Sequence, residues 1–465
     1  MKNFLAELME QEEKLLNCVH CGFCLPACPT YSRLGDEADS PRGRLHFMRA
    51  VVDGRLDPGS RAFAHHLDRC LGCRACESVC PSGVEYGHLL EGAREVVARA
   101  NPRGFLDRLL PRVMATPGLL TPAMFLARAL RATGFPSLAA ERLPSGGALG
   151  QARLGLGMVA ATVAPQRLNG AGVGRGQVPR VQSVSLTAGA ATRPARRPGS
   201  PENGLAGSLG ECTATAVLLG CVQEGLLSRV NRATIRVLEA NGYRIVQVPG
   251  QGCCGAIHAH TGDLEGARRL ARKNIRAMEA SGVRAIAVNA AGCGATMKEY
   301  AHLLAGDEEY ARRAAVVGAM VRDVSELLGR EGLRVGAPLP LTVTYDAPCH
   351  LLHAQKISRE PLFLLASIPE LRLVPLEKHD ECCGGAGVYG ISHPELGGAI
   401  GRDKVLAILE TGADVVATGN PGCMMQIGAG LRMAGRTVDV VHPVELLDES
   451  YRRAGFYAER AGGND

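Results

Sequence analysis

The second half of the chain alternates between short apolar runs and longer amphipathic runs. The short runs are rich in β-branched and aliphatic residues, and they predict strands at 215–220, 243–248, 283–288, 341–345, 371–376, 414–419 and 437–441. Between them, apolar residues recur at helical spacing, most clearly in 230–241, 264–281 and 394–411. Because strands that alternate with helices form layered structures, this half is predicted to hold mostly parallel sheets covered by helices.

The first half shows helical periodicity around two dense groups of cysteines, at 4–16, 42–54 and 87–100. This pattern predicts a helical domain over residues 1–100. Residues 101–142 keep helical spacing but are broken by proline, which predicts a helical connector that packs on a neighbour; a partner-binding or membrane-surface role is the alternative. Residues 143–211 are rich in Gly, Ala, Pro, Ser and Arg and predict a flexible linker.

The second half also repeats internally. A lone cysteine, a Cys-Cys-Gly triplet and a second lone cysteine occur in this order twice, and the second set is displaced by 128, 129 and 130 residues. The landmarks are Cys221, Cys253-Cys254-Gly255 and Cys293, then Cys349, Cys382-Cys383-Gly384 and Cys423. The predicted fold class is α+β and multi-domain, with a helical N-terminal domain and a C-terminal α/β domain of two repeated modules at 212–335 and 336–465.

Two cysteine runs in the first domain have the same form, C-x2-C-x2-C-x3-C-P, which is the two-cluster ferredoxin pattern. Three thiolates at two-residue gaps wrap one face of a [4Fe–4S] cubane, Gly22 and Gly72 ease the sharp turns, and inward N–H groups stabilise the negative sulfurs. The fourth cysteine of each run reaches the other cluster. The predicted ligand sets are Cys18, Cys21, Cys24 and Cys80 for one cluster and Cys70, Cys73, Cys76 and Cys28 for the other. Zinc is the alternative metal, but it suits this repeated pattern poorly.

The basic stretch 40–44, which lies between the two runs, has three possible roles: it raises a cluster's reduction potential, contacts a partner, or is a solvated helix start.

Each C-terminal module offers four further cysteines, and glycine beside them lets backbone approach a bulky ligand. Adjacent cysteines can ligate neighbouring irons, so these two sets are candidates for one or two further clusters; zinc and inert buried thiols stay open. His350, His353 and His379 are candidate ligands or proton carriers, or structural histidines. Cys212 stands outside both repeats and is expected to be free.

Composition narrows the class of protein. The net charge of +6 arises from residues 142–201, which hold eight Arg and no acid, and no nucleic-acid recognition motif accompanies it. Seventeen cysteines, an odd number in a long chain, favour metal ligands over a disulfide scaffold. The N-terminus lacks the apolar core of a signal peptide, and the longest weakly polar run, 154–165, is too short to cross a bilayer. We therefore expect no transmembrane segment and a cytoplasmic protein, with peripheral contact to the inner membrane face left open.

Several segments resemble the iron–sulfur subunit of glycolate oxidase, a glycolate dehydrogenase. They are CVHCGFCLPACPTY, GDEADSPRGRLHFMRAVVDG, HLDRCLGCRACESVCPSGVEYGHLLE and APCHLLHAQKI, and the resemblance covers residues 1–135 and 214–455. It implies an electron-transfer subunit that is not catalytic alone, with FAD on flavoprotein partners that oxidise glycolate to glyoxylate and a quinone or membrane carrier as acceptor. No strand leads into a GxGxxG sequence here, which supports a separate flavin subunit.

The repeated modules also resemble those of lactate and glycerol-3-phosphate dehydrogenase iron–sulfur subunits and of heterodisulfide reductase. In that reductase a module ends in C-x-x-C, whereas here Cys293 and Cys423 have no such partner. The missing fifth cysteine counts against thiol or disulfide chemistry.

Overall fold

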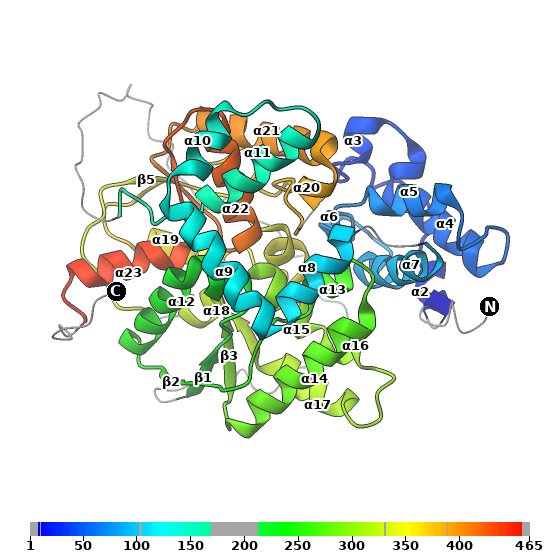
Figure 1. Ribbon diagram of the computed structural model, residues 1–465. Coiled ribbons are helices and arrows are strands. Elements are labelled where there is room, and N and C mark those ends of the chain that lie inside the picture. The colour runs from blue at the N-terminus through cyan, green and yellow to red at the C-terminus, as the bar shows by residue number, and fades with distance from the viewer. Residues whose placement is uncertain are drawn as a thin grey trace.

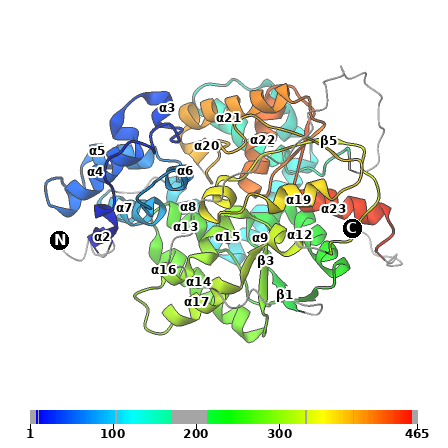
Figure 2. The ribbon, with the colours of Figure 1, turned by 180° about the vertical axis from the view of Figure 1, so that it is seen from behind.

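The computed structural model describes residues 8–9, 11–101, 105–168, 213–329, 332–387 and 389–457. A helical N-terminal region lies beside two α/β modules, and a connector of helices crosses the front of both modules (Figure 1). From behind, the N-terminal region again lies against the modules (Figure 2). This arrangement confirms the predicted combination of a helical region and a repeated α/β region.

The N-terminal region is built from short helices around a small apolar core. Its elements are α2 (Glu12–Leu16), α3 (Tyr31–Leu34), η1 (Glu37–Asp39), α4 (Pro41–Val52), α5 (Arg61–Asp68), α6 (Ala75–Ser78) and α7 (Tyr86–Ala100). Met48, Phe63 and Leu89, from three different helices, are fully buried in that core. The Ser40 side chain accepts a hydrogen bond from the Gly43 amide and so caps the start of α4.

The described part of the connector and of the segment after it contains four helices. They are α8 (Phe105–Ala115), α9 (Pro117–Ala132), α10 (Phe135–Arg142) and α11 (Gly147–Ala160). Helix α11 lies within the predicted linker 143–211, and its Leu154 and Met158 are buried against α22 of the second module. The linker prediction was therefore wrong for α11, because the small residues there allow close packing: Gly157 approaches Ala429. The remainder of that segment, 169–211, falls outside the described residues, as does Cys212.

Each module contains a four-stranded parallel sheet, and the two sheets have the same strand order, β2-β1-β3-β4 and β6-β5-β7-β8. The strands are β1 (Ala214–Val217), β2 (Arg244–Val246), β3 (Ala285–Val288), β4 (Val321–Asp323), β5 (Thr342–Tyr345), β6 (Arg372–Val374), β7 (Val415–Ala417) and β8 (Asp439–Val441). All pairings are parallel. Seven of these strands lie where the sequence predicts them, but β4 is not predicted, since Arg322 and Asp323 interrupt its apolar pattern.

Helices cover both faces of the sheets, as parallel strands require. In the first module they are α12 (Val222–Ala240), α13 (Ala256–His260), α14 (Leu264–Ala280), α15 (Ala291–Lys298), α16 (Tyr300–Leu303), α17 (Ala311–Met320) and α18 (Val324–Leu328). In the second they are η2 (His350–Ala354), α19 (Glu360–Ala366), α20 (Tyr389–Ser392), α21 (Pro394–Glu410), α22 (Pro421–Met433) and α23 (Pro443–Arg453). One apolar core includes Val230 and Leu238 of α12 together with Leu447 of α23, so the two modules are packed as one body.

The first module touches the N-terminal region at a glycine. Gly262, in the turn before α14, has φ +77°, and a Cβ at this position would lie 2.4 Å from the carbonyl oxygen of Arg94 on α7. Only glycine avoids that overlap, so this turn fixes how closely the two parts approach.

We expect Gly262→Ala to destabilise the protein by about 2–4 kcal/mol, because it adds both a strained φ and a clash with α7 backbone. Gly282→Ala is the matched control: Gly282 also has a positive φ, of +61°, but nothing lies within 4 Å of its added Cβ. The control should cost only about 1–2 kcal/mol. Denaturant unfolding of both variants measures the difference, and equal losses would show that the approach of α7 is not constrained here.

Candidate metal centres

The two predicted ligand sets of the N-terminal region surround two separate cavities. One cavity is lined by Cys18, Cys21, Cys24 and Cys80, and the other by Cys28, Cys70, Cys73 and Cys76, with Cys76 bordering both. Each cavity thus combines three cysteines of one run with the fourth of the other run. No disulfide forms among the described cysteines. The donor set and its division fit two cubane clusters.

The loops that carry these cysteines turn sharply, as expected from their glycines. Gly22 and Gly72 have φ values of +86° and +67°, and the non-glycine residues His20 and Arg74 are also left-handed, at 54° and 63°. The Gly72 amide donates to Cys70 Sγ over 3.4 Å. Backbone donors of this kind stabilise negative sulfur, which the inward-facing loop was predicted to do.

Of the two arginines in the basic stretch, Arg44 is buried and Arg42 is half-buried. Arg44 lines the second cavity with an exposed fraction of 1%, and it donates to the His66 carbonyl oxygen over 2.6 Å and to Thr30 Oγ1 over 3.1 Å. Burial alone would lower the pKa of Arg44, but neighbouring anionic groups, Cys70 first among them, raise it overall. Arg44 is therefore not part of a solvated helix start. It places a fixed positive charge beside the second cavity.

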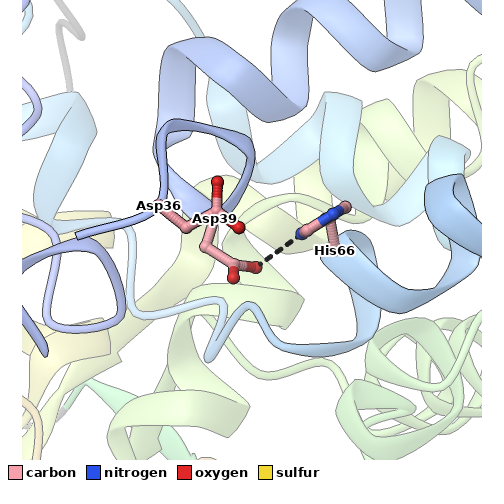
Figure 3. A group of neighbouring side chains, drawn as sticks. All are labelled: Asp36, Asp39 and His66. Carbon is pink, nitrogen blue, oxygen red and sulfur yellow. Dashed lines mark hydrogen bonds and ion pairs between the residues drawn. The ribbon is translucent and has the colours of Figure 1, made fainter. Parts of the chain in front are cut away.

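Asp39, Asp36 and His66 approach one another closely enough to hold a small ion (Figure 3). Asp39, however, already accepts hydrogen bonds from His66 Nδ1 over 3.0 Å and from Arg69 over 2.8 Å, and it pairs with Arg44 at 3.3 Å. Burial raises the pKa of Asp39, yet these partners outweigh it and hold the pKa below its ordinary value. This carboxylate balances Arg44, and two cationic neighbours make it a poor ligand for a second ion.

In each module the four cysteines follow three neighbouring strands at one edge of the sheet. Cys221 comes after β1, Cys253 and Cys254 after β2, and Cys293 in the first turn of α15 after β3. The second module repeats this with Cys349, Cys382, Cys383 and Cys423 after β5, β6 and β7. The carboxyl ends of parallel strands converge on a shared crevice, where open α/β sheets bind their ligands.

The thiols of each module lie in contact. In the first module, hydrogen bonds join Cys221 to Cys253 and Cys254 to Cys293. The bond with Cys253, together with burial, raises the pKa of the Cys221 thiol well above its ordinary value. In the second module, Cys382 bonds to Cys349 and Cys383 bonds to Cys423. Four apposed sulfurs, three of them buried in each module, cannot all carry charge unless metal ions neutralise them, so both sets fit a metal cluster.

The glycines after the cysteine pairs serve helix packing rather than the approach of backbone to a ligand. Gly384 has φ +79°, and a Cβ there would lie 2.4 Å from the Gly397 carbonyl oxygen on α21. Gly255 has φ +96°, and a Cβ there would lie 3.2 Å from Ala267 Cα on α14, a tight but less severe approach. These contacts pull each cysteine pair against the following helix.

The two modules differ in the residue that supports the cysteine pair. In the second, Lys404 is buried, forms an ion pair with Asp346 at 2.9 Å, and donates to the Lys378 carbonyl oxygen over 2.6 Å. Hydrogen bonds from Cys382 and Cys423 lower the pKa of Cys383 well below its ordinary value, and the charge of Lys404 adds to this. Lys404 lies on α21, and the equivalent position in the first module, on α14, holds Asn274. The Asn274 amide donates to the Cys253 carbonyl oxygen over 2.9 Å. Neither residue is predicted to support the cysteines from local sequence patterns, although alignment of the repeats places Lys404 opposite Asn274.

The second module docks directly on the second ferredoxin loop. Cys73 and Cys349 pack in one apolar group with Leu71 and Cys382. Burial is the main cause that raises the pKa of Cys73, and the nearby Cys349 sulfur raises it further. Around this contact, His350 Nε2 bonds to the Gly72 carbonyl oxygen over 3.0 Å.

The candidate histidines are engaged in protein contacts. His353 Nδ1 bonds to Ser78 Oγ over 2.9 Å, and its Nε2 bonds to the Asp380 carbonyl oxygen over 3.1 Å. Burial lowers the pKa of His350 to about 4, which leaves it neutral. His379 contributes a backbone carbonyl to Ala347. His350 and His353 therefore act in the structure as links between the module and the ferredoxin loop.

Among the described residues, no single helix is long and apolar enough to cross a membrane. The segments Leu109–Ala115 and Pro117–Ala132 meet that criterion only as a pair, and they are bent by 103°.

Comparison with known proteins matches two families to this chain. A 4Fe-4S dicluster domain matches residues 14–84, and a cysteine-rich domain matches 215–298 and 343–428. The chain is 36% identical to the probable glycolate oxidase iron–sulfur subunit of Bacillus subtilis, over 97% of both chains. It is 33% identical to the glycolate oxidase iron–sulfur subunit of Escherichia coli, over 96% of this chain and 97% of that one. Lactate utilization protein A of Exiguobacterium is 29% identical over 51% of this chain and 98% of its own.

We expect Arg44→Gln to lower the reduction potential of the cluster in the second cavity, because reduction adds negative charge beside a cation that is no longer present. A loss of about 1.4 kcal/mol corresponds to roughly 60 mV for one electron. Redox titration followed by EPR measures this shift. Arg44→Lys should restore most of the potential. Arg49→Gln, which removes the same charge from the same helix together with two ion pairs, to Glu12 and Asp53, should leave it unchanged. Equal potentials in Arg44→Gln and Arg49→Gln would contradict this role.

Proposed function

Because this chain belongs to the family of glycolate oxidase iron–sulfur subunits, we propose that it passes electrons from a flavoprotein partner, which oxidises glycolate to glyoxylate, to a quinone-type acceptor. The flavin, FAD, is on the partner, and this chain contributes no catalytic residue to the oxidation of glycolate. The observation that carries the proposal is the unbroken series of cysteine sites, from the exposed first loop through the second cavity to Cys349 of the second module.

In this proposal the eight N-terminal cysteines hold two [4Fe–4S] clusters, divided as the two cavities divide them. The four cysteines of the second module hold a further cluster, next to the second cubane, and those of the first module form an equivalent site. Electrons then move one at a time between neighbouring centres.

The first cluster is the point where electrons arrive from the flavoprotein. Cys21 is exposed, and the apolar side chains of Val19 and Phe23 beside it have exposed fractions of 67% and 65%. Exposed apolar side chains around a redox loop suit a docking partner, which would bring its flavin close to this cluster.

The share of this chain that each relative matches favours glycolate over lactate as the partner's substrate. The glycolate oxidase subunits match this chain through both halves, whereas lactate utilization protein A matches 51% of it. Nothing in the cysteine pattern favours a thiol or disulfide reductase over this role.

The division of ligands can be tested with paired substitutions. Cys18→Ser combined with Cys80→Ser removes two ligands of one cluster and should lower the iron content by about four atoms. Cys73→Ser combined with Cys80→Ser removes one ligand from each cluster and should lower the iron content by up to about eight atoms. Iron and acid-labile sulfide, with EPR of the reduced protein, measure both losses. If the first pair also depleted both clusters, or the second pair only one, the proposed division would be wrong.

A peripheral contact with the membrane completes the proposal, because a quinone-type acceptor resides there. The outward face of α9 carries an apolar stripe at helical spacing, formed by Leu119, Pro122, Phe125, Leu126 and Ala129. Phe125 and Leu126 have exposed fractions of 68% and 69%. Residues 108–140 contain no acid, and exposed Arg112 and Arg128 are near the stripe. An apolar face bordered by arginine suits the surface of anionic lipid.

We expect Phe125→Glu with Leu126→Glu to reduce binding to vesicles of phosphatidylcholine and phosphatidylglycerol by at least about tenfold, because each side chain contributes more than about 1.4 kcal/mol when buried. Cosedimentation of the full chain with vesicles measures this. Leu406→Glu, at a residue of 59% exposure on α21, should bind as the wild type does. Unchanged binding by the double variant, or binding to neutral vesicles only, would rule out this surface.

A further inference from the structure

A cavity of about 440 Å³ lies where the N-terminal region meets both modules, apart from the two cysteine-lined cavities. Its walls come from α5 and α7 of the N-terminal region, α13 of the first module, and α20 with the residues before it in the second. Cys70, a proposed ligand of the second cubane, forms part of the wall. The volume is that of a small-molecule site.

The walls combine flat apolar surface with stacked rings. Leu67, Leu71 and Ile257 supply aliphatic surface. Tyr389 and His393 stack with ring centroids 4.3 Å apart and an angle of 12° between their planes. Leu71 and Tyr389 also pack with Cys382 of the second module, so this side of the cavity borders the contact between the two cluster sites.

Cationic and hydrogen-bonding groups are placed around that apolar surface. Arg61 and His65 stand at the solvent side of α5, and Arg94 and His260 lie deeper, on α7 and α13. Arg94 is held by a hydrogen bond to the Cys70 carbonyl oxygen at 2.5 Å, and His260 by Glu91 at 3.5 Å. Positive groups near a ring stabilise carbonyl oxygens on which negative charge builds up during reduction.

We propose that this cavity binds the ring of the quinone-class acceptor and that electrons leave the protein here, from the cluster held by Cys70. The inference rests on the proposed electron-transfer function and deepens it by locating the acceptor. A simple carboxylate would use the cations but not the stacked rings and aliphatic walls. A flat ring with two carbonyl groups uses both, and its position against a cluster ligand makes electron transfer direct.

The reaction balances with the partners already named. The flavin of the partner, reduced by glycolate, supplies two electrons, which cross the clusters one at a time. The quinone accepts both electrons and takes two protons from solvent through the open side of the cavity, and it leaves as the quinol. A cluster held by Cys70 would carry these electrons singly, and no bond to protein forms or breaks.

Filling the cavity tests the proposal. Arg94, Val97 and Ala98 line it at helical spacing along α7, and Asn101 lines it just after the helix, whereas Ala100 is not among the lining residues. The cluster-loaded full chain is reduced with dithionite and mixed with menadione, and reoxidation is followed by stopped-flow absorbance of the clusters. Ala98→Trp should lose saturation with menadione and slow the reaction at least tenfold. Ala100→Trp should match the wild type, and ferricyanide, a one-electron oxidant that needs no ring site, should oxidise all variants equally.

Ile257→Trp closes the same cavity from α13, away from the two cubane loops, and should repeat the result of Ala98→Trp. Saturable reoxidation by menadione that survives both substitutions would overturn the proposal. The outcome is independent of the broader function: clusters that form and accept electrons support the relay even if this cavity is not where they leave.

Discussion

The structure depends on how negative sulfur is buried. Sixteen of the described cysteines are free thiols, and most of them lie in the interior, where an uncompensated thiolate is costly. The chain reduces this cost in two ways: it brings the sulfurs together in groups, and it places positive charge or hydrogen-bond donors beside them. Four sulfurs meet at each site, where metal can share their charge, and fixed donors such as Arg44, Lys404 and the Gly72 amide lie against them.

The same constraint explains why three parts of the chain form one body. The ferredoxin loop that carries Cys73 is closed on its outer side by the second module, through His350 and His353, instead of by its own domain. The first module adds the close approach of Gly262 to α7. Docking therefore shields the second cavity from water and at the same time brings it next to Cys349, so that one set of contacts serves both stability and electron transfer.

Much of this could be predicted from sequence because the repeat and the cysteine spacing are local patterns. The spacing predicted which cysteines line each of the two cavities, and the alternation of strands and helices predicted seven of the eight described strands. Strand β4 was not predicted because two of its three residues are charged. Its place before SELL at 325–328 nevertheless matches the place of β8 before VELL at 444–447. Helix α11 was missed because its small residues look like a linker until α22 is present to pack on them. The contact of Cys73 with Cys349 depends on docking between segments far apart in the chain, which no local pattern records.

The central claim is that clusters continue from the N-terminal region into the modules. Iron and acid-labile sulfide analysis with EPR, on protein purified without oxygen, tests it most directly when wild type is compared with a Cys253→Ser/Cys383→Ser variant. The account predicts about twelve or more irons in the wild type and a clear drop in the variant, with the two cubane signals retained. About eight irons in both proteins would mean that the module cysteines hold no cluster and that the relay ends at Cys73.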